Sequence, residues 1–312
     1  MDIAIIGTGG IAQKAYFPLL AVMPDIHLKA VHSHTRSNAE DAASRWKIPF
    51  STDRLQDIID QKVSAALVVS STASHFEICK ALLENGIDVY SEKPLTDSSE
   101  KSFTLGKIAA DNNRILSVGF NRRYALLYKQ AKEILADRPI NLAVVRKHRT
   151  EASNPSLYAH YQDDTIHQID LLRYYCGDVQ ALHTTYQMQD DVLVSAASTV
   201  RLPQGGMGMV TICNRAGAWL ESVTLHAEGI SMHVDAFQRL RVMQDDHEKV
   251  YGMDRAGKWV PSLRERGFYG EVEHFLQCVR TRENPLTNAI EAAKSEELME
   301  NMVRVCGEPV PS

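Results

Sequence analysis

The sequence has 312 residues, a formal net charge of -5 and a pI near 6.2. This charge gives no basic footprint, so we expect no nucleic-acid partner. The hydrophobic share of 44% and the charged share of 23% are those of an ordinary globular protein, and the length suits two domains. No apolar run approaches the ~20 residues that cross a bilayer, so we expect no membrane partner either.

The cysteines are few and scattered, and none forms a Cys-x-x-Cys pair: Cys79, Cys176, Cys213, Cys278 and Cys306. An odd, scattered set favours reduced thiols over a disulfide framework or a zinc site. The chain also runs from Met1 into a strand-like segment without the regions of a signal peptide. We therefore expect a cytoplasmic protein.

Short apolar segments alternate with amphipathic ones in the first third of the chain. The apolar segments predict strands at residues 3–7, 27–33, 65–70, 88–91 and 115–119. Two of the intervening helices carry start signals, at Ser74 and Asp97, because each precedes a glutamate by three residues. Gly86 is placed to end the first of these helices. Parallel strands need crossover helices, so residues 1–120 are predicted to form a doubly wound, Rossmann-type parallel sheet.

The pattern changes after residue 120. Helices are predicted at 123–137, 164–176, 269–281 and 289–305, and strands at 141–149, 179–189, 192–202, 207–214, 221–228 and 231–235. Consecutive strands with short connections favour antiparallel pairing. Residues 121–312 are therefore predicted to form an α+β domain with an open, mainly antiparallel sheet, for substrate binding and oligomerisation.

A glycine-rich loop follows the first predicted strand and opens a helix: Gly7, Thr8, Gly9, Gly10, Ile11 and Ala12. The first glycine permits a tight turn, the second lets the backbone approach a pyrophosphate, and Ala12 is small enough for close packing of helix and strand. The helix N-terminus then offers unpaired N–H groups to the phosphates. This spacing in this context predicts a dinucleotide site.

The end of the second strand indicates which nucleotide binds. An NAD site places an acid there, on the ribose 2′-hydroxyl. No Asp or Glu occurs between Asp25 and Glu40, whereas Ser33, Thr35 and Arg36 offer two hydroxyls and a guanidinium that suit a 2′-phosphate. We expect NADP as the cofactor. NAD stays possible if Arg36 is a solvated surface residue.

Four motifs resemble those of the Gfo/Idh/MocA oxidoreductase family: Ser91-Glu92-Lys93-Pro94, Ser71-Thr72-Ala73-Ser74-His75, Gly119-Phe120-Asn121-Arg122-Arg123-Tyr124, and Asp163-x-x-x-His167-x-x-Asp170. Further segments around Lys147, Asn214 and Arg266 resemble its bacterial MviM/YceM-like branch. The resemblance covers the whole chain. It implies the fold given above, a cis Lys93–Pro94 peptide, and cofactor contacts from Ser71, Thr72, His75, Glu92, Lys93 and Asn121.

The resemblance also implies the catalytic residues. It makes His167 the general acid/base, Asp163 its partner and Lys93 a third polar group on the substrate oxygen. The residue types suit this chemistry, because histidine titrates near neutral pH and a carboxylate orients its ring. Four residues apart on a helix, Asp163 and His167 are expected to lie on one face.

The substrate pocket departs from the family pattern. Residues 158–162, Tyr-Ala-His-Tyr-Gln, stand where the family often has three glycines, which is expected to narrow the pocket. Asp164 is an additional acid near His160, but the spacing matches no zinc site, and we expect no metal. The cations Arg122, Lys147, Arg149 and Arg215 are either ligands for an anionic substrate or solvated surface charges. Tyr124 and Tyr161 are either cleft aromatics or packing residues.

We therefore expect an NAD(P)-dependent dehydrogenase or reductase that acts on a hydroxyl or carbonyl carbon of a sugar, polyol or related small molecule. A cofactor-binding sensor without hydride transfer is the alternative, and reduction of an imine or conjugated double bond stays open. The resemblance implies a homodimer or homotetramer through the second sheet, where Met207 and Met209 belong to the sheet core or to the oligomer face.

Overall fold

The computed structural model describes residues 1–252 and 262–310. The chain forms two compact units, one of Met1–Phe120 with Phe268–Ala293, the other of Asn121–Gly267 with Lys294–Ser312. The expected division placed 121–312 in one continuous domain, but the segment after Phe268 returns to the first unit. Its aromatic rings explain why, since Phe268 packs on Tyr16 and Phe275 on Tyr90.

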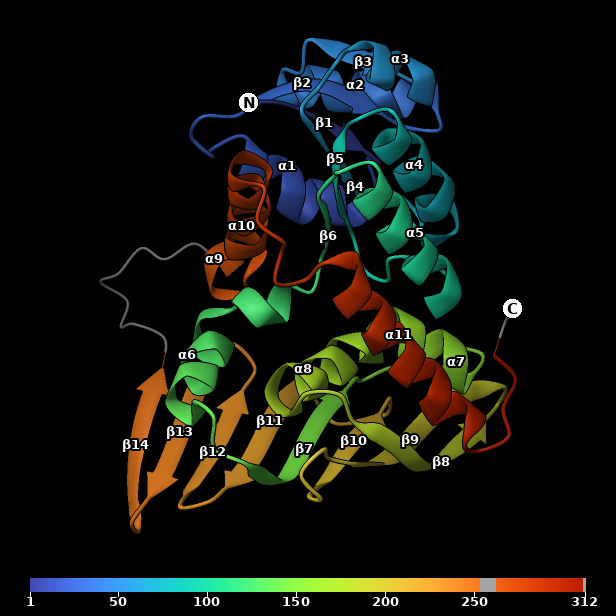
Figure 1. The fold of residues 1–312 in the computed structure, drawn as a ribbon. Coiled ribbons are helices and arrows are strands. Elements are labelled where there is room, and N and C mark those ends of the chain that lie inside the picture. The colour runs from blue at the N-terminus through green and yellow to red at the C-terminus, as the bar shows by residue number, and fades with distance from the viewer. Residues whose placement is uncertain (253–261, 311–312) are drawn as a thin grey trace. The chain divides into compact units, whose positions relative to one another are not determined.

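The first unit is built on a six-stranded sheet in the order β3-β2-β1-β4-β5-β6, and every strand pair in it is parallel (Figure 1). The Rossmann sheet expected from the strand–helix alternation is thus confirmed. The strands are β1 (Asp2–Ile6), β2 (His27–His32), β3 (Phe50–Thr52), β4 (Ala65–Val68), β5 (Asp88–Ser91) and β6 (Leu116–Val118). All residues of β4 and β5 are buried, as expected of central parallel strands covered on both faces.

The helices of this unit are η1 (Ala12–Tyr16), α1 (Phe17–Leu20), α2 (Arg36–Trp46), α3 (Leu55–Asp60), α4 (Thr72–Glu84), α5 (Ser99–Asp111) and α10 (Phe268–Thr281). Strand β3 and helix α3 lie outside the predicted elements, because three and six residues are too short to show a periodic pattern.

Both predicted helix starts are wrong by one to three residues. The N-cap of α4 is Ser71 and that of α5 is Ser98, both with the extended backbone a cap requires. Ser98 accepts a hydrogen bond from the amide of Lys101, whereas the Asp97 carboxylate bonds the Lys101 ammonium at 2.9 Å. Gly86 follows the end of α4 at a φ of 78°, as expected of a terminating glycine.

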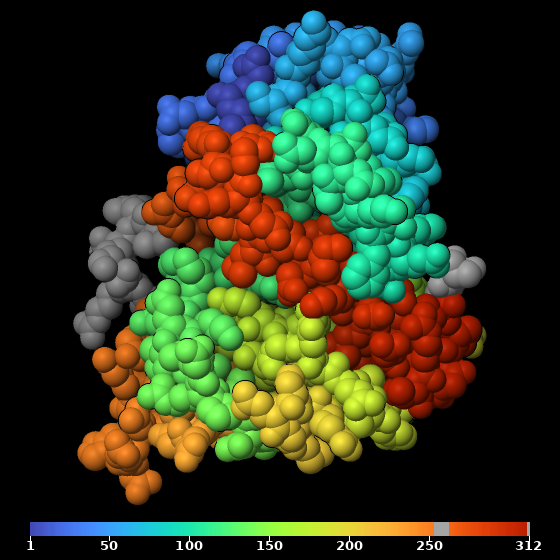
Figure 2. Space-filling model, in the orientation of Figure 1, coloured from blue at the N-terminus to red at the C-terminus, as the bar shows by residue number. Residues whose placement is uncertain are grey.

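The second unit is built on an eight-stranded sheet in the order β14-β13-β12-β11-β7-β10-β9-β8. Only the pairing of β7 with β10 is parallel among these strands, which confirms the mainly antiparallel prediction. The strands are β7 (Ile140–His148), β8 (Gln180–Gln189), β9 (Val192–Arg201), β10 (Met207–Cys213), β11 (Leu220–Ala227), β12 (Ile230–Asp235), β13 (Arg239–Gln244) and β14 (His247–Gly252). Strands β13 and β14 lie outside the predicted elements. Most residues of β14 are exposed, and Figure 2 shows this edge in orange at the surface.

The remaining helices are η2 (Asn121–Tyr124), α6 (Leu126–Leu135), α7 (Leu157–His160), η3 (Tyr161–Thr165), α8 (Ile166–Cys176), α9 (Ser262–Glu265) and α11 (Ala289–Arg304). Helices α6, α7 and α8 lie over one face of the eight-stranded sheet (Figure 1). The side chains under them are buried, among them Ala143, Val145 and Val210. Within the described residues, no helix is long and apolar enough to cross a membrane.

Candidate nucleotide-binding and catalytic site

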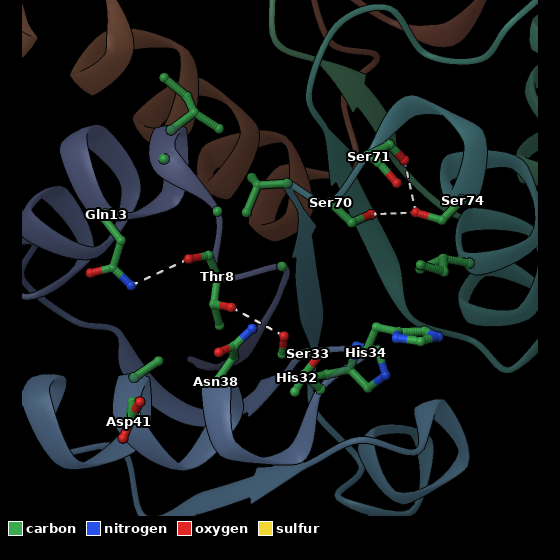
Figure 3. Close-up of a pocket in the computed structure, with 18 of the residues that line it drawn as sticks. Thr8, Gln13, His32, Ser33, His34, Asn38, Asp41, Ser70, Ser71 and Ser74 are labelled. Atoms are coloured by element: carbon green, nitrogen blue, oxygen red, sulfur yellow. Dashed lines mark hydrogen bonds between the residues drawn. The ribbon is translucent and has the colours of Figure 1, made fainter.

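A cavity of about 800 Å³ opens at the carboxyl ends of β1, β2 and β4 (Figure 3). The strand order reverses between β1 and β4, and such switch points are where open α/β sheets bind ligands. The described residues that line the cavity are Gly7, Thr8, Gly9, Gly10, Ile11, Gln13, His32, Ser33, His34, Thr35, Asn38, Asp41, Ala42, Arg45, Val69, Ser70, Ser71, Ser74 and Ile78. The glycine loop predicted from the sequence is therefore at the cavity wall.

The three glycines of the loop serve different purposes. Gly7 has a φ of 111°, and a Cβ atom there would lie 2.6 Å from the backbone nitrogen of Ser70. Only glycine fits that position. Gly9 and Gly10 have no neighbouring atom within 4 Å of such a Cβ, so their bare backbone faces open space. That space suits a pyrophosphate approaching the loop, and the geometry fits the expected dinucleotide.

The helix after the loop begins as a π-helix, η1, a rare form that is found frequently at functional sites. Gln13 in η1 donates to the carbonyl of Thr8 at 3.4 Å and accepts from the Trp46 indole at 3.2 Å. Gln13 thereby connects the loop to α2. Helix α2 faces the cavity with four residues that were not predicted as site residues: Asn38, Asp41, Ala42 and Arg45. Their i, i+3, i+4, i+7 spacing is the signal that would have revealed them.

The end of β2 presents hydroxyl and imidazole groups to the cavity. Thr8 Oγ1 donates to Ser33 Oγ at 3.1 Å, and His32 and His34 stand beside them in Figure 3. Burial lowers the pKa of His32, which favours its neutral form. Arg36 is placed differently from the expectation. Its side chain is half exposed, does not line the cavity, and pairs with Glu40 at 2.7 Å.

The segment after β5 is held by a buried hydrogen-bond network. Glu92 accepts from the Tyr16 hydroxyl at 2.5 Å and from the backbone amide of Lys93 at 2.9 Å. Tyr16 also lies 2.8 Å from the Tyr90 hydroxyl and 3.4 Å from a Glu271 carboxylate oxygen. Burial, followed by the charge of Glu92, raises the pKa of Tyr16 well above its usual value. Tyr16 ends η1, so this network joins the nucleotide loop to the backbone of Lys93.

The peptide between Lys93 and Pro94 is cis, as the resemblance implied. Some of the other expected cofactor residues of this unit line the cavity and some do not. Ser71 lines the cavity, whereas Thr72 and Glu92 do not. His75 is a structural residue: it is 1% exposed, and its ring nitrogens lie 3.0 and 3.1 Å from the carbonyls of Pro94 and Ser70. His75 does not line the cavity, and both of its ring nitrogens face backbone carbonyls.

Asp163 and His167 lie in the second unit. The exposed Asp163 belongs to the π-helix η3, and the buried His167 to the first turn of α8. The prediction that both residues lie on one helical face requires a regular α-helix through them, whereas the segment with Asp163 is a π-helix. Asp170, the last residue of the motif, has a structural role: both its oxygens bind the guanidinium of Arg123, at 2.7 and 2.9 Å, and Ser295 donates to it. Both partners are buried, so this pair fixes η2 on α8.

The cations proposed for an anionic substrate are all engaged within the second unit. Arg122 makes a two-pronged contact of 3.0 Å per bond with the buried carboxylate of Glu221. Lys147 and Arg149 both bind Asp164. Arg215 bonds Gln189 and Asp190 at the surface. The Arg122 guanidinium and the Lys147 ammonium hold the pKa of Glu221 at about 2 in spite of its burial, and burial lowers the pKa of Lys147 to about 8.

Three further predicted site residues are buried. Tyr161 is 0% exposed, and its hydroxyl lies 2.8 Å from Ser198 Oγ beneath the sheet, so it is a packing residue. Tyr124 is also buried. Asn121 belongs to the second unit, where its amide donates to the Arg266 carbonyl and accepts from Arg122. Within the described part of the chain, no three His, Cys, Asp or Glu side chains are grouped to hold a metal ion.

A glycine loop at the switch point of a 3-2-1-4-5-6 parallel sheet defines a dinucleotide-binding protein. Residues 1–120 match the model of the GFO_IDH_MocA family, described as an oxidoreductase family with an NAD-binding Rossmann fold. YceM of Salmonella typhimurium is 29% identical over 308 residues, which cover 97% of each chain. Residues 1–120 thus match the NAD-binding domain of the Gfo/Idh/MocA oxidoreductases, the whole chain is similar to YceM, and the protein is an NAD(P)-dependent oxidoreductase.

Two further comparisons agree with this assignment. A scyllo-inositol 2-dehydrogenase (NAD(+)) of Bacillus subtilis is 23% identical over 93% of this chain and 89% of its own. The crystal structure of a dehydrogenase, MviM, from Clostridium difficile is 25% identical, with a TM-score of 0.89 over 97% of this chain and 99% of that one. The likeness to MviM-type proteins expected from the sequence is confirmed.

Proposed function

We propose that this protein is an NADP-preferring dehydrogenase or reductase that acts on a hydroxyl or carbonyl carbon of a small sugar, polyol or related compound. The observation that carries the proposal is the Tyr16–Glu92–Lys93 network, which joins the nucleotide loop to a lysine of the family motif. A sensor that only binds the cofactor has no need of a lysine whose backbone amide is held in this way.

The proposed roles follow from the chemistry of each side chain. When bound, the nicotinamide supplies or accepts the hydride. His167 gives a proton to the substrate oxygen during reduction and removes it during oxidation, while Asp163 orients the imidazole. Lys93 donates a hydrogen bond to the same oxygen, and the clamp on its backbone amide limits where its side chain can reach.

The preference for NADP is supported by the end of β2. Ser33 and Thr35 face the cavity there, and the chain has no acidic residue between Asp25 and Glu40, although Asp41 lines the cavity from α2. The N-terminus of α2 adds a positive dipole end at this place. Arg36 would have to leave Glu40 to reach a 2′-phosphate, and both side chains are exposed enough to part at low cost.

The test is NADPH oxidation, followed at 340 nm, against a panel of sugar and polyol ketones. His167→Asn and Lys93→Ala are each expected to lower kcat by about 10² or more, because each removes a group that acts in the transition state. His183→Asn and Lys101→Ala, at exposed or half-exposed positions, are the matched controls and should retain activity. Cofactor binding is measured in every variant. Full activity in both test variants would refute the mechanism.

A cofactor-binding sensor is the alternative function. It predicts no turnover of any carbonyl compound by the wild-type protein, together with NADPH binding that changes the protein's conformation. The retention of Lys93, Asp163 and His167 speaks for catalysis.

We also propose that the protein works in the cytoplasm as a homodimer or homotetramer. All five cysteines are free thiols, which suits a reducing compartment. The proposed contact is the helix-free face of the eight-stranded sheet, where Leu142, Met207 and Met209 are 40%, 55% and 36% exposed. Met207 pairs with Leu142 across the ladder, so their side chains share a face.

A further inference from the structure

A second cavity lies entirely within the second unit and has a volume of about 350 Å³. It is formed where the chain leaves β7, by the end of α7 and two residues of η3, and by Trp219 before β11. The described residues that line it are Arg149, Thr150, Glu151, Ser153, Asn154, His160, Asp163, Asp164 and Trp219. It contains Asp163, the expected partner of the catalytic histidine.

His160 is the unusual member of this lining. The residue is 3% exposed, yet its Nε2 atom has no hydrogen-bond partner among the described residues. Its Nδ1 atom lies 2.9 Å from the amide nitrogen of Asn154 and 3.4 Å from that of Asn214. The Asn214 amide nitrogen is fixed in this orientation, because it also donates to the Leu193 carbonyl at 3.0 Å.

These contacts determine where the hydrogen of the imidazole lies. Amide nitrogens only donate, so Nδ1 of His160 must accept. Burial lowers the pKa of His160, and the neutral ring carries one hydrogen, which is therefore on Nε2. A buried N–H group without an acceptor costs free energy, which a ligand oxygen in the cavity would recover.

The charge of the cavity decides what kind of oxygen this is. Its described lining has one cationic side chain, Arg149, against three acidic ones, Glu151, Asp163 and Asp164. The guanidinium of Arg149 already binds Asp164, as does Lys147 behind it. A carboxylate or phosphate would meet a net negative lining with no uncommitted cation in it. A hydroxylated, uncharged ligand can accept from His160 and donate to the carboxylates.

We propose that His160 is a specificity-determining residue, whose Nε2–H group binds an uncharged hydroxyl or carbonyl oxygen of the substrate in this cavity. This inference rests on the proposed function and narrows it: the substrate presents a neutral polyhydroxyl group here, in place of the carboxylate or phosphate of a sugar acid. Trp219, 37% exposed, offers an aromatic surface to the apolar face of such a ring.

The test compares uncharged hexoses, pentoses and cyclitols with the corresponding uronates and sugar phosphates. Binding is measured by calorimetry on the full-length protein with saturating NADP⁺. At least one uncharged compound should bind about tenfold more tightly than its anionic counterpart. His160→Phe should weaken that binding about tenfold or more, since it removes one donor. His160→Gln, which can place an amide N–H near the same point, should restore part of the affinity.

Two controls separate this role from a structural one. His148→Phe changes another partly buried histidine of the same unit, outside the cavity lining, and should leave sugar affinity unchanged. In the wild-type protein, ¹⁵N spectra should show the Nε2–H tautomer of His160, with a shift of that signal on addition of the bound sugar. Tighter binding of the anions, an Nδ1–H tautomer, wild-type affinity in His160→Phe, or no binding of any uncharged compound would each overturn the inference.

Hydride transfer is measured in parallel so that the two proposals can fail separately. Sugar binding that depends on His160 without any turnover would leave this inference standing and refute the proposed reaction. Turnover of uronates in preference to sugars would support the proposed reaction and refute this inference.

Discussion

At the residue scale, two glycines of the nucleotide loop are needed for different reasons. Gly7 is required by the fold, because its φ is positive and a Cβ would collide with the backbone that follows β4. Gly9 is not required by the fold, since open space surrounds it. The sequence shows both as equal members of one motif, and only the packing around each distinguishes them.

This difference predicts that alanine at position 7 lowers stability, whereas alanine at position 9 lowers the affinity for the cofactor. Gly7→Ala should lower the free energy of unfolding by roughly 2 kcal/mol or more, through strain and overlap. Gly9→Ala should leave the melting temperature unchanged but raise the Kd for NADPH about tenfold, because the methyl group occupies the approach of the pyrophosphate. Thermal unfolding and fluorescence titration measure the two effects. Equal loss of stability in both variants would contradict the assignment.

Glu221 is a second case at this scale. Its folded-state pKa of about 2 is below the usual 4.5, so the native state holds the proton less tightly than the unfolded state. Its contribution to stability is therefore fully present above pH ~4.5 and is lost as the pH falls toward 2. The contribution amounts to roughly 3 kcal/mol at most.

Urea unfolding between pH 2 and 5 checks this prediction. The free energy of unfolding of wild type should fall more steeply with decreasing pH than that of Glu221→Gln, by up to one proton. Glu40→Gln is the exposed control and should keep the wild-type slope. Parallel curves for wild type and Glu221→Gln would show that Glu221 titrates normally.

At the element scale, α2 carries the charges beside the nucleotide cavity. Arg36 begins this helix and pairs with Glu40 one turn later, while Arg45 reaches the cavity from its last turn. An i, i+4 pair on an exposed helix surface is weak, so cofactor binding can compete with it. The glutamate thus acts against any role of Arg36 in binding a 2′-phosphate.

Substitutions on the two sides of this pair should shift NADPH affinity in opposite directions. Arg36→Ala should raise the Kd for NADPH several-fold, and Glu40→Ala should lower it by releasing Arg36. NADH is the matched control ligand, and its Kd should change little in either variant, since it lacks the 2′-phosphate. Equal effects on the Kd values of NADH and NADPH would contradict the role of Arg36 in binding the 2′-phosphate. Arg45, which lines the cavity, would then be the remaining candidate.

At the scale of the whole molecule, the eight-stranded sheet has one face covered by helices and one that carries exposed apolar side chains. Contiguous apolar surface of this kind usually marks an interaction site. Isolated apolar residues elsewhere, such as Val22 at 74% exposure, need no such explanation. A second copy of the chain is the partner we propose.

Light scattering on a size-exclusion column tests the proposed assembly. The wild-type chain should elute as a dimer or tetramer, and Met207→Asp combined with Met209→Asp should reduce its mass to that of a monomer, because the charges cannot be buried unpaired. Val22→Asp, on the other unit, is the control and should keep the wild-type mass. A monomeric wild-type protein would contradict the proposal.

The sequence by itself determined the features that depend on near neighbours. The glycine loop, five of the six strands of the first sheet and the absence of an acid after β2 are all readable there, because backbone conformation and periodicity are local properties. Short or exposed elements such as β3 and β14 were not predicted, since their apolar residues form too little of a periodic pattern.

Only the tertiary structure decided which charges are committed and which polar groups lack partners. Arg122 meets Glu221 across 99 residues of chain, and His160 meets Asn214 across 54. In the sequence, Arg122, Lys147 and Arg149 are equal candidates for binding an anionic substrate. Folding pairs them with distant carboxylates, because the desolvation of each charge requires a partner that the local sequence does not contain. It also leaves Nε2 of a buried, cavity-lining histidine without a partner among the described residues.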